Sequence, residues 1–163
     1  MESNNDLLID DNHIVFIPYN VPSSKNSKIA TSRGVFCSKL VKTYLRSLGI
    51  KRYSVTKRTI EYYKGANNAF PVQDLKRLFN GKDSPAVVGI HFVRKDARKF
   101  DFHNISQIIF DLLVASEVIH DDNMDFIIPV PMILDNKYYS INKEEPGVFI
   151  KVFNNEIKKD QKQ

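Results

Sequence analysis

The chain has 163 residues, a formal net charge of +5 and 42% hydrophobic residues, among them seven tyrosines and eleven phenylalanines. This composition suits one globular domain and excludes an intrinsically disordered chain, and no apolar run approaches the roughly 20 residues of a membrane-spanning helix. The single cysteine, Cys37, excludes an intrachain disulfide framework and a cysteine-rich zinc site, and the acidic first residues lack the basic start of a signal peptide, so we expect a cytoplasmic protein with no membrane contact.

The first predicted segment is an acidic extension, residues 1–12, which holds four acids and no Lys or Arg. Residues 13–19 form an apolar run that predicts a first strand, ended by Pro22 and a polar loop at residues 23–27. We expect the folded domain to begin with this strand and to span residues 13–153.

A helix is predicted next. Ser38 is a suitable N-cap, apolar residues recur at helical spacing as far as Leu48, and Gly49 is a suitable stop. The outer face of this helix carries three cations: Lys39, Lys42 and Arg46.

The rest of the chain alternates between further helices and strands. Residues 51–70 are ambiguous between a basic helix and an irregular excursion, and Pro71 suits the start of a short helix at residues 72–79, ended by Gly81. Beyond it we predict, in order, a strand at 86–93, a long helix at 102–117, a strand at 126–134 weakened by two prolines, a strand at 147–153 and a polar tail at 154–163. The expected fold is α+β, a mixed sheet of about four or five strands with two main helices packed on it.

Charge is segregated along the chain. Residues 12–60 contain ten basic residues and no acid, whereas residues 100–136 contain seven acids and no Lys or Arg. A basic field of this length favours a polyanionic partner, of which nucleic acid is the commonest. Carboxylates beside a phosphate backbone call for a divalent cation between them, as in metal-dependent nucleases. Neutralisation of one segment by the other within the fold is the alternative.

The helix predicted from Phe102 carries most of the candidate chemistry. Its core face holds five aliphatic residues and a serine: Ile105, Ile108, Ile109, Leu112, Leu113 and Ser116. A polar stripe occupies the other side and the residue before the helix: Asp101, His103, Asn104, Gln107 and Asp111. Phe110 and Val114 also fall on that side, which indicates a helix partly covered on both sides, a second subunit being one candidate cover. Three acids follow in the loop that leaves the helix: Asp121, Asp122 and Asp125.

The run from Asp101 to Asp122, DFHNISQIIFDLLVASEVIHDD, resembles the signature of the RusA family of Holliday-junction resolvases, and the match needs no gap. The matching positions are Asp101, Asn104, Asp111, Leu113, Asp121 and Asp122. A weaker match precedes it, because VPSSKNSK resembles that family's early loop and GVFCSKLVKTYLRS the helix after that loop. Together these segments cover about a third of the chain.

The resemblance implies a homodimeric, Mg²⁺-dependent endonuclease that binds four-way DNA junctions in recombination and repair and nicks two strands symmetrically. The implied metal ligands are Asp101, His103, Asp121 and Asp122. The implied catalytic residues are Asp101, His103, Gln107 and Asp122. The expected DNA contacts come from the early loop and the basic segment: Lys25, Asn26, Lys28, Arg33, Lys39, Lys42 and Arg46.

Two departures from the family pattern leave alternatives open. His103 stands where the family has its second metal-site aspartate, and Gln107 stands where it has its catalytic lysine. Imidazole suits Mn²⁺ better than Mg²⁺, and an amide brings no positive charge to a reacting phosphate. The chain is then either a variant nuclease, with Mn²⁺ or with a lysine such as Lys25 as a substitute, or a non-catalytic protein that binds branched DNA on the same fold. A basic RNA-binding module is a third, weaker hypothesis, because no RNP-type or KH signature is present.

Several candidates also have a purely structural explanation. His103 could face solvent near a helix start, Asp111 could bond a neighbouring backbone group, and Asp121 and Asp125 could be turn residues. Asp101 and Asp122 are the strongest site candidates on the sequence.

Overall fold

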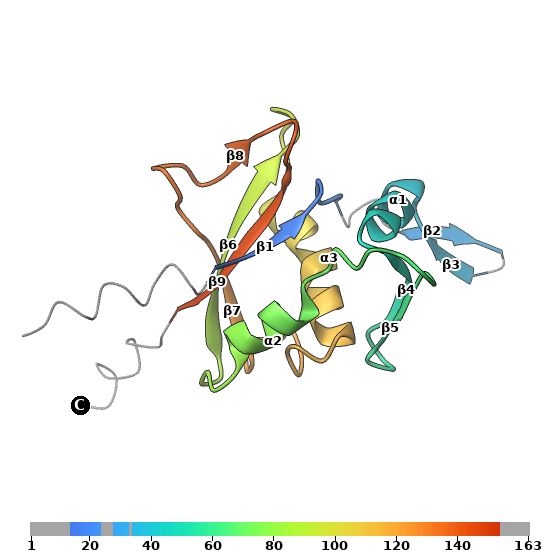
Figure 1. Cartoon of the computed structure of the whole chain (residues 1–163), viewed down its shortest axis with the longest axis horizontal. Helices are drawn as coiled ribbons and strands as arrows, with labels where there is room; N and C mark the ends of the chain where they lie inside the picture. The colour runs from blue at the N-terminus through green and yellow to red at the C-terminus, as the bar shows by residue number, and fades with distance from the viewer. Residues whose placement is uncertain (1–13, 24–27, 33, 154–163) are drawn as a thin grey trace, which may run out of the picture.

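A mixed five-stranded sheet forms the centre of the protein, and the computed structural model describes residues 14–23, 28–32 and 34–153 (Figure 1). The strands are β1 (Ile14–Pro18), β6 (Ala86–Arg94), β7 (Ile127–Pro131), β8 (Ser140–Ile141) and β9 (Gly147–Phe153). Their order is β1-β9-β6-β7, and β8 pairs with the far end of β6. Strand β9 is antiparallel to β1 and β6, whereas β7 and β8 run parallel to β6. The predicted α+β class with a mixed sheet is confirmed.

Strand β6 lies between β9 and β7, so its side chains are buried along almost its whole length. Val88, Ile90 and Phe92 are at most 1% exposed, and their alternate spacing places them on one face of the sheet. The neighbouring β7 is an edge strand, which tolerates Pro129 and Pro131 because its outer side needs no backbone donor. Strand β7 is shorter than the predicted strand at residues 126–134.

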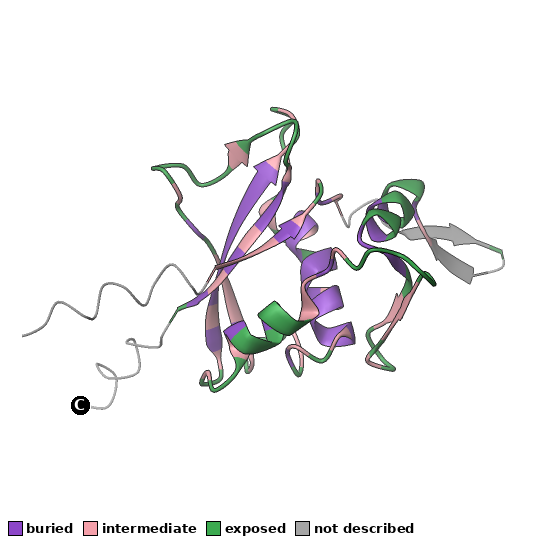
Figure 2. Ribbon diagram, in the orientation of Figure 1, coloured by how far each residue is buried: buried purple, intermediate pink, exposed green. Residues whose placement is uncertain are grey.

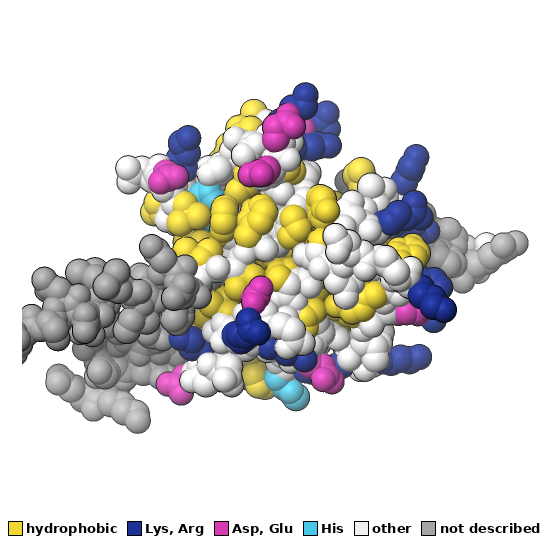
Figure 3. Space-filling view, viewed as in Figure 1, with side chains coloured by type: hydrophobic (Ala, Val, Ile, Leu, Met, Phe, Trp, Pro, Cys, Tyr) yellow, Lys and Arg dark blue, Asp and Glu magenta, His cyan; other side chains and the backbone are white. Residues whose placement is uncertain are grey.

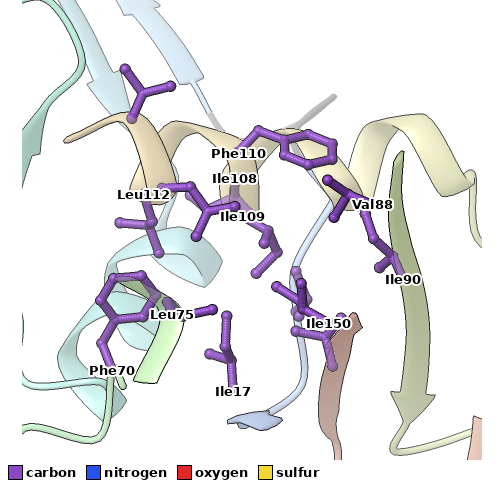
Figure 4. Close-up of a cluster of buried hydrophobic side chains, with 14 of the residues drawn as sticks. Ile17, Phe70, Leu75, Val88, Ile90, Ile108, Ile109, Phe110, Leu112 and Ile150 are labelled. Carbon is purple, nitrogen blue, oxygen red and sulfur yellow. The ribbon is translucent and has the colours of Figure 1, made fainter. Parts of the chain in front are cut away.

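Two helices cover one face of the sheet (Figures 1 and 2). Helix α2 (Val72–Phe79) contacts β1 and β9, and α3 (Phe102–Ala115) lies next to it with almost no exposed apolar side chain. Aliphatic side chains from β1, α2, β6, α3 and β9 converge into one core (Figure 4). Helix α3 ends two residues earlier than predicted, because Glu117 adopts a left-handed φ of 60° that stops the helix.

A second layer lies beyond α3 (Figure 1). It contains α1 (Lys39–Ser47), the hairpin of β4 (Ile50–Ser54) and β5 (Thr59–Tyr62), and the hairpin of β2 (Lys28–Thr31) and β3 (Gly34–Cys37). Strands β4 and β5 both contact α3, so the expected cover of its second side comes from this same chain. The possible basic helix within residues 51–70 is wrong, since this stretch holds the β4–β5 hairpin.

Helix α1 begins after Ser38 as predicted and ends at Ser47, one residue before the predicted Leu48, but it does not lie on the main sheet. The Ser38 side chain accepts a hydrogen bond from the Val41 N–H at 3.4 Å, and Gly49 follows the helix with a φ of 80°. The helix packs on β4, across α3 from the sheet (Figure 1). The prediction of two main helices on the sheet is therefore correct for α3 and wrong for α1.

Several predicted segments lie outside the described residues. They are the extension 1–12, the first residue of the predicted first strand, the DNA-contact candidates Lys25, Asn26 and Arg33, and the tail 154–163. Among the described helices, none has the length and apolar content needed to cross a membrane.

Candidate functional site

An amide joins two carboxylates along the outer side of α3. The Gln107 Nε2 atom donates to Asp111 Oδ1 at 2.9 Å and to Asp122 Oδ2 at 3.1 Å. Gln107 and Asp111 are one helical turn apart, so their contact follows from the helix itself. Asp122 is 15 residues from Gln107 and reaches it only because the chain reverses after α3. We call these three residues the amide–carboxylate cluster.

The reversal that brings in Asp122 is held by Arg58. The guanidinium donates to the backbone carbonyl of Ile119 at 3.0 Å and to that of His120, which ties the β4–β5 hairpin to the loop after α3. Within the loop, Asp121 Oδ1 accepts the Asp122 N–H at 2.8 Å. This hydrogen bond is the main cause of a lowered pKa of the half-buried Asp121 carboxyl.

A tyrosine from the hairpin completes the surroundings of the cluster. The Tyr53 hydroxyl lies 3.5 Å from Asp111 Oδ2, at the outer limit of a hydrogen bond. Burial, and then the negative charge of Asp111, raise the pKa of the Tyr53 phenol above its ordinary value. Tyr53 therefore stays protonated and acts as a donor towards the carboxylate.

Asp111 of the cluster lines a hollow of about 630 Å³ between α1 and the β4–β5 hairpin. We call it the basic hollow, and its lining includes four cations, two tyrosines and one acid: Lys42, Arg46, Lys51, Arg52, Tyr53, Tyr63 and Asp111. Figure 3 shows Lys and Arg side chains gathered at this end of the molecule, over α1, β4 and β5. Asp111 thus lies beside four cations, of which Lys51 and Arg52 pair with Glu61. Lys42 and Arg46 are in no ion pair among the described residues, so these two cations can attract a phosphate next to the acidic group.

Of the four predicted DNA contacts that the structure describes, three lie on α1 and one, Lys28, lies on β2. Lys39, Lys42 and Arg46 are exposed, and none of them takes part in an ion pair among the described residues. Lys28 begins β2. Arg58, by contrast, is only 29% exposed and is bound to carbonyls, so this member of the basic segment has a structural role.

Asp101 and His103 are not part of the cluster. The Asp101 side chain caps α3, because its Oδ1 accepts the N–H groups of His103 at 2.9 Å and Asn104 at 3.2 Å. The His103 side chain is exposed, and its ring contacts the edge of Phe102. The structure therefore brings together Gln107 and Asp122 of the predicted catalytic set, and it leaves Asp101 and His103 near the start of the helix.

The positions of these carboxylates determine which metal ions the site could bind. Among the described residues, no three His, Cys, Asp or Glu side chains form a group that could hold a metal ion, so the predicted set of Asp101, His103, Asp121 and Asp122 is not assembled. The cluster offers two carboxylates and an amide. Mg²⁺ often takes only one or two protein carboxylates and completes its shell with water and substrate phosphates. The donor set thus fits a Mg²⁺ shared with a phosphate and does not fit an ion enclosed by protein ligands alone.

Two members of this site were not selected from the sequence. The position of Asp111, one turn after Gln107 on the polar stripe, indicated a possible site residue. The same position was equally compatible with a structural role. Tyr53 had none, because it lies 58 residues from Asp111 in a hairpin that the pattern did not predict. A scan against models of protein families and a search of curated proteins both found no match to this chain.

Proposed function

We propose that this protein is a metal-dependent endonuclease that acts on branched DNA, as the resemblance of residues 101–122 to the RusA family suggests. The observation that carries the proposal is the amide–carboxylate cluster, in which Gln107 contacts both Asp122 and Asp111, the residue of the cluster that lines the basic hollow. Gln107 occupies the position of the family's catalytic lysine, and Asp122 occupies the position of the last aspartate of its motif. Two residues that act in one catalytic centre must lie close together, as these two do.

DNA binding is supported by the charges that the fold leaves without internal partners. The described ion pairs include only one between the basic segment and the acidic segment, Arg58 with Glu117 at 3.9 Å. Mutual neutralisation of the two segments therefore explains little of their charge. The cations of α1 are exposed and unpaired among the described residues, so they suit a phosphate backbone, whereas Lys51 and Arg52 of the basic hollow pair with Glu61. The resemblance implies that two copies of the chain act together on one junction.

In this proposal each residue has a chemical role. Asp111 and Asp122 would hold Mg²⁺, which when bound activates water and offsets negative charge at the scissile phosphate. Gln107 orients the two carboxylates, and Lys42 and Arg46 hold the DNA backbone next to them. The donor set contains only oxygen, so His103 gives no reason to expect a preference for Mn²⁺.

A second candidate is a non-catalytic protein that binds branched DNA. The observation that favours it is the same amide, because Gln107 already satisfies both carboxylates without a cation and brings no positive charge of its own. The basic hollow and α1 would serve this function unchanged.

Incubation of the purified protein with a synthetic four-way junction and a matched linear duplex, in Mg²⁺, Mn²⁺ or EDTA, separates the two candidates. We expect cleavage of the junction in Mg²⁺ and its loss in Asp122→Asn, with binding in EDTA preserved. Asp125→Asn is the matched control, since Asp125 is an exposed acid of the same loop whose side chain is not part of the cluster. Tight junction binding without cleavage in either metal would establish the second candidate, and full cleavage by Asp122→Asn would exclude that residue from the site.

A further inference from the structure

A second hollow, of about 540 Å³, lies on the opposite side of α1 from the basic hollow. Its walls are the residues that follow β1, the Tyr44 side of α1, and the segment from Arg94 to Asp101. We call it the Tyr44 hollow. Its volume falls within the roughly 300–1,000 Å³ of typical ligand pockets. No residue of the amide–carboxylate cluster lines it.

The Tyr44 hollow has a cationic wall. Four basic residues line it within six positions of the chain: Arg94, Lys95, Arg98 and Lys99. The two carboxylates of the wall are both engaged, Asp96 with Arg98 at 3.7 Å and Asp101 with the N–H groups at the start of α3. Cations therefore outnumber acids here, and Figure 3 shows Lys and Arg side chains at the tip of the molecule where β6 ends. Such a wall suits a phosphate group.

Tyr44, one of the residues that line the hollow, has a buried hydroxyl without a hydrogen-bond partner among the described residues. The residue is 4% exposed. Native structures rarely leave a buried polar group unsatisfied, so this hydroxyl calls for a ligand or another partner. Burial raises the pKa of the Tyr44 phenol above its ordinary value, so the group remains a donor.

The mouth of the hollow carries an aromatic ring on a fixed backbone. Tyr19 is 42% exposed and has a left-handed φ of 78°, which is unusual for a residue other than glycine and is often maintained at binding sites. The residues after it are fastened to the cationic segment, because the Lys95 N–H donates to Asn20 Oδ1 at 3.1 Å and the Arg94 guanidinium donates to the Val21 carbonyl at 2.6 Å. The ring and the cations thus belong to one cross-linked unit.

We propose that the Tyr44 hollow binds one unpaired nucleotide. Its phosphate contacts Lys95, Arg98 and Lys99, its base stacks on Tyr19, and a polar atom of the base or sugar accepts a hydrogen bond from Tyr44. The nucleotide comes either from an unpaired position in DNA or from a free nucleoside monophosphate. This site goes beyond the proposed nuclease, because it uses other residues and requires no catalysis.

The test measures binding by fluorescence anisotropy in EDTA, so that cleavage plays no part. The probes are a DNA hairpin with one unpaired adenine, the same hairpin fully paired, free dAMP and inorganic phosphate. We expect the wild type to prefer the bulged hairpin and dAMP to compete for it better than phosphate does. Tyr44→Phe removes only the hydroxyl and should weaken binding of the bulged hairpin by about three- to tenfold, with the paired hairpin unaffected. Tyr19→Ala should weaken it by about tenfold, as expected for lost base stacking.

The control variant is Lys137→Gln, an exposed lysine that lines neither hollow and should change nothing. Competition by dAMP would show that a free nucleotide suffices, whereas selective binding of the bulged hairpin without such competition would assign the site to DNA alone. Equal affinity for both hairpins, or phosphate competing as well as dAMP, would overturn the proposal. A protein that fails to cleave junctions but shows the Tyr44→Phe effect would refute the proposed nuclease and leave this site intact.

Discussion

Arg58 links the part of the chain that carries the basic segment to the part that carries Asp122, and its replacement tests this fold directly. Arg58→Met keeps most of the aliphatic stem and removes the guanidinium that binds the carbonyls of Ile119 and His120. Hydrogen bonds to a charged group contribute about 1.5–3 kcal/mol each. The hydrogen bond to Ile119 is partly buried, so we assign it a contribution near the lower end of that range. The hydrogen bond to His120 is exposed and the ion pair with Glu117 is long, so both add little to the free energy of unfolding. We expect the free energy of unfolding to fall by about 2 kcal/mol.

Urea denaturation followed by circular dichroism measures this loss. With a slope of about 1–3 kcal/mol per molar urea, the midpoint should fall by about 1 M with the slope unchanged. Arg77→Met is the control, because Arg77 is 79% exposed and makes only a surface pair with Asp74 at 3.0 Å, worth about 0.3–0.5 kcal/mol.

The salt dependence of DNA binding distinguishes this structural role from a phosphate contact. Loss of one phosphate contact lowers the slope of log K against log salt by about 0.9 in magnitude. Lys42→Ala should produce that change and Arg58→Met should not. A normal unfolding midpoint together with a reduced salt slope in Arg58→Met would refute the reasoning, since Arg58 would then bind DNA rather than the loop after α3.

Three further predictions follow from single contacts. Gln107→Lys restores the lysine that the resembled family has at this position and brings a cation next to the reacting phosphate, so it should raise the rate of junction cleavage by up to about 10²-fold in a single-turnover assay at saturating Mg²⁺. A slower variant would argue against a catalytic role of this position. Tyr44 and Tyr53 have raised pKa values in the folded protein, so both stay protonated there at a pH at which the tyrosines of the unfolded chain ionise, above about pH 10. The free energy of unfolding should therefore fall as the pH rises past that value. The double Tyr→Phe variant should show a weaker dependence of the thermal unfolding midpoint on pH. Gly147→Ala should destabilise the protein more than Gly89→Ala. The added Cβ would lie 2.5 Å from the backbone carbonyl of Ile17 in the first variant, and 2.5 Å from the Phe153 ring, which can move, in the second. Equal losses in the urea midpoint would contradict this comparison.

The sequence by itself determined the elements whose signals are local. Helix α1 was recognisable because the Ser38 cap and the Gly49 stop act on backbone groups within one turn. The contact between Gln107 and Asp111 was equally accessible, since helical geometry places residues four apart on one side. The same periodicity identified Phe110 and Val114 as covered residues, although it did not reveal what covers them.

The tertiary structure decided the features that depend on distant partners. Residues 50–62 carry many charged side chains and no clear alternation, and they form a hairpin whose strands pair with each other and pack on α3. That packing brings Tyr53 to Asp111 and Arg58 to the loop after α3, and the loop in turn carries Asp122 to Gln107. No local pattern encodes these contacts, because their geometry depends on where separate elements pack. Of the ligands that the motif suggested, Asp101 and His103 lie at the start of α3, whereas Asp122 lies on its outer side, where it contacts Gln107 near the hairpin.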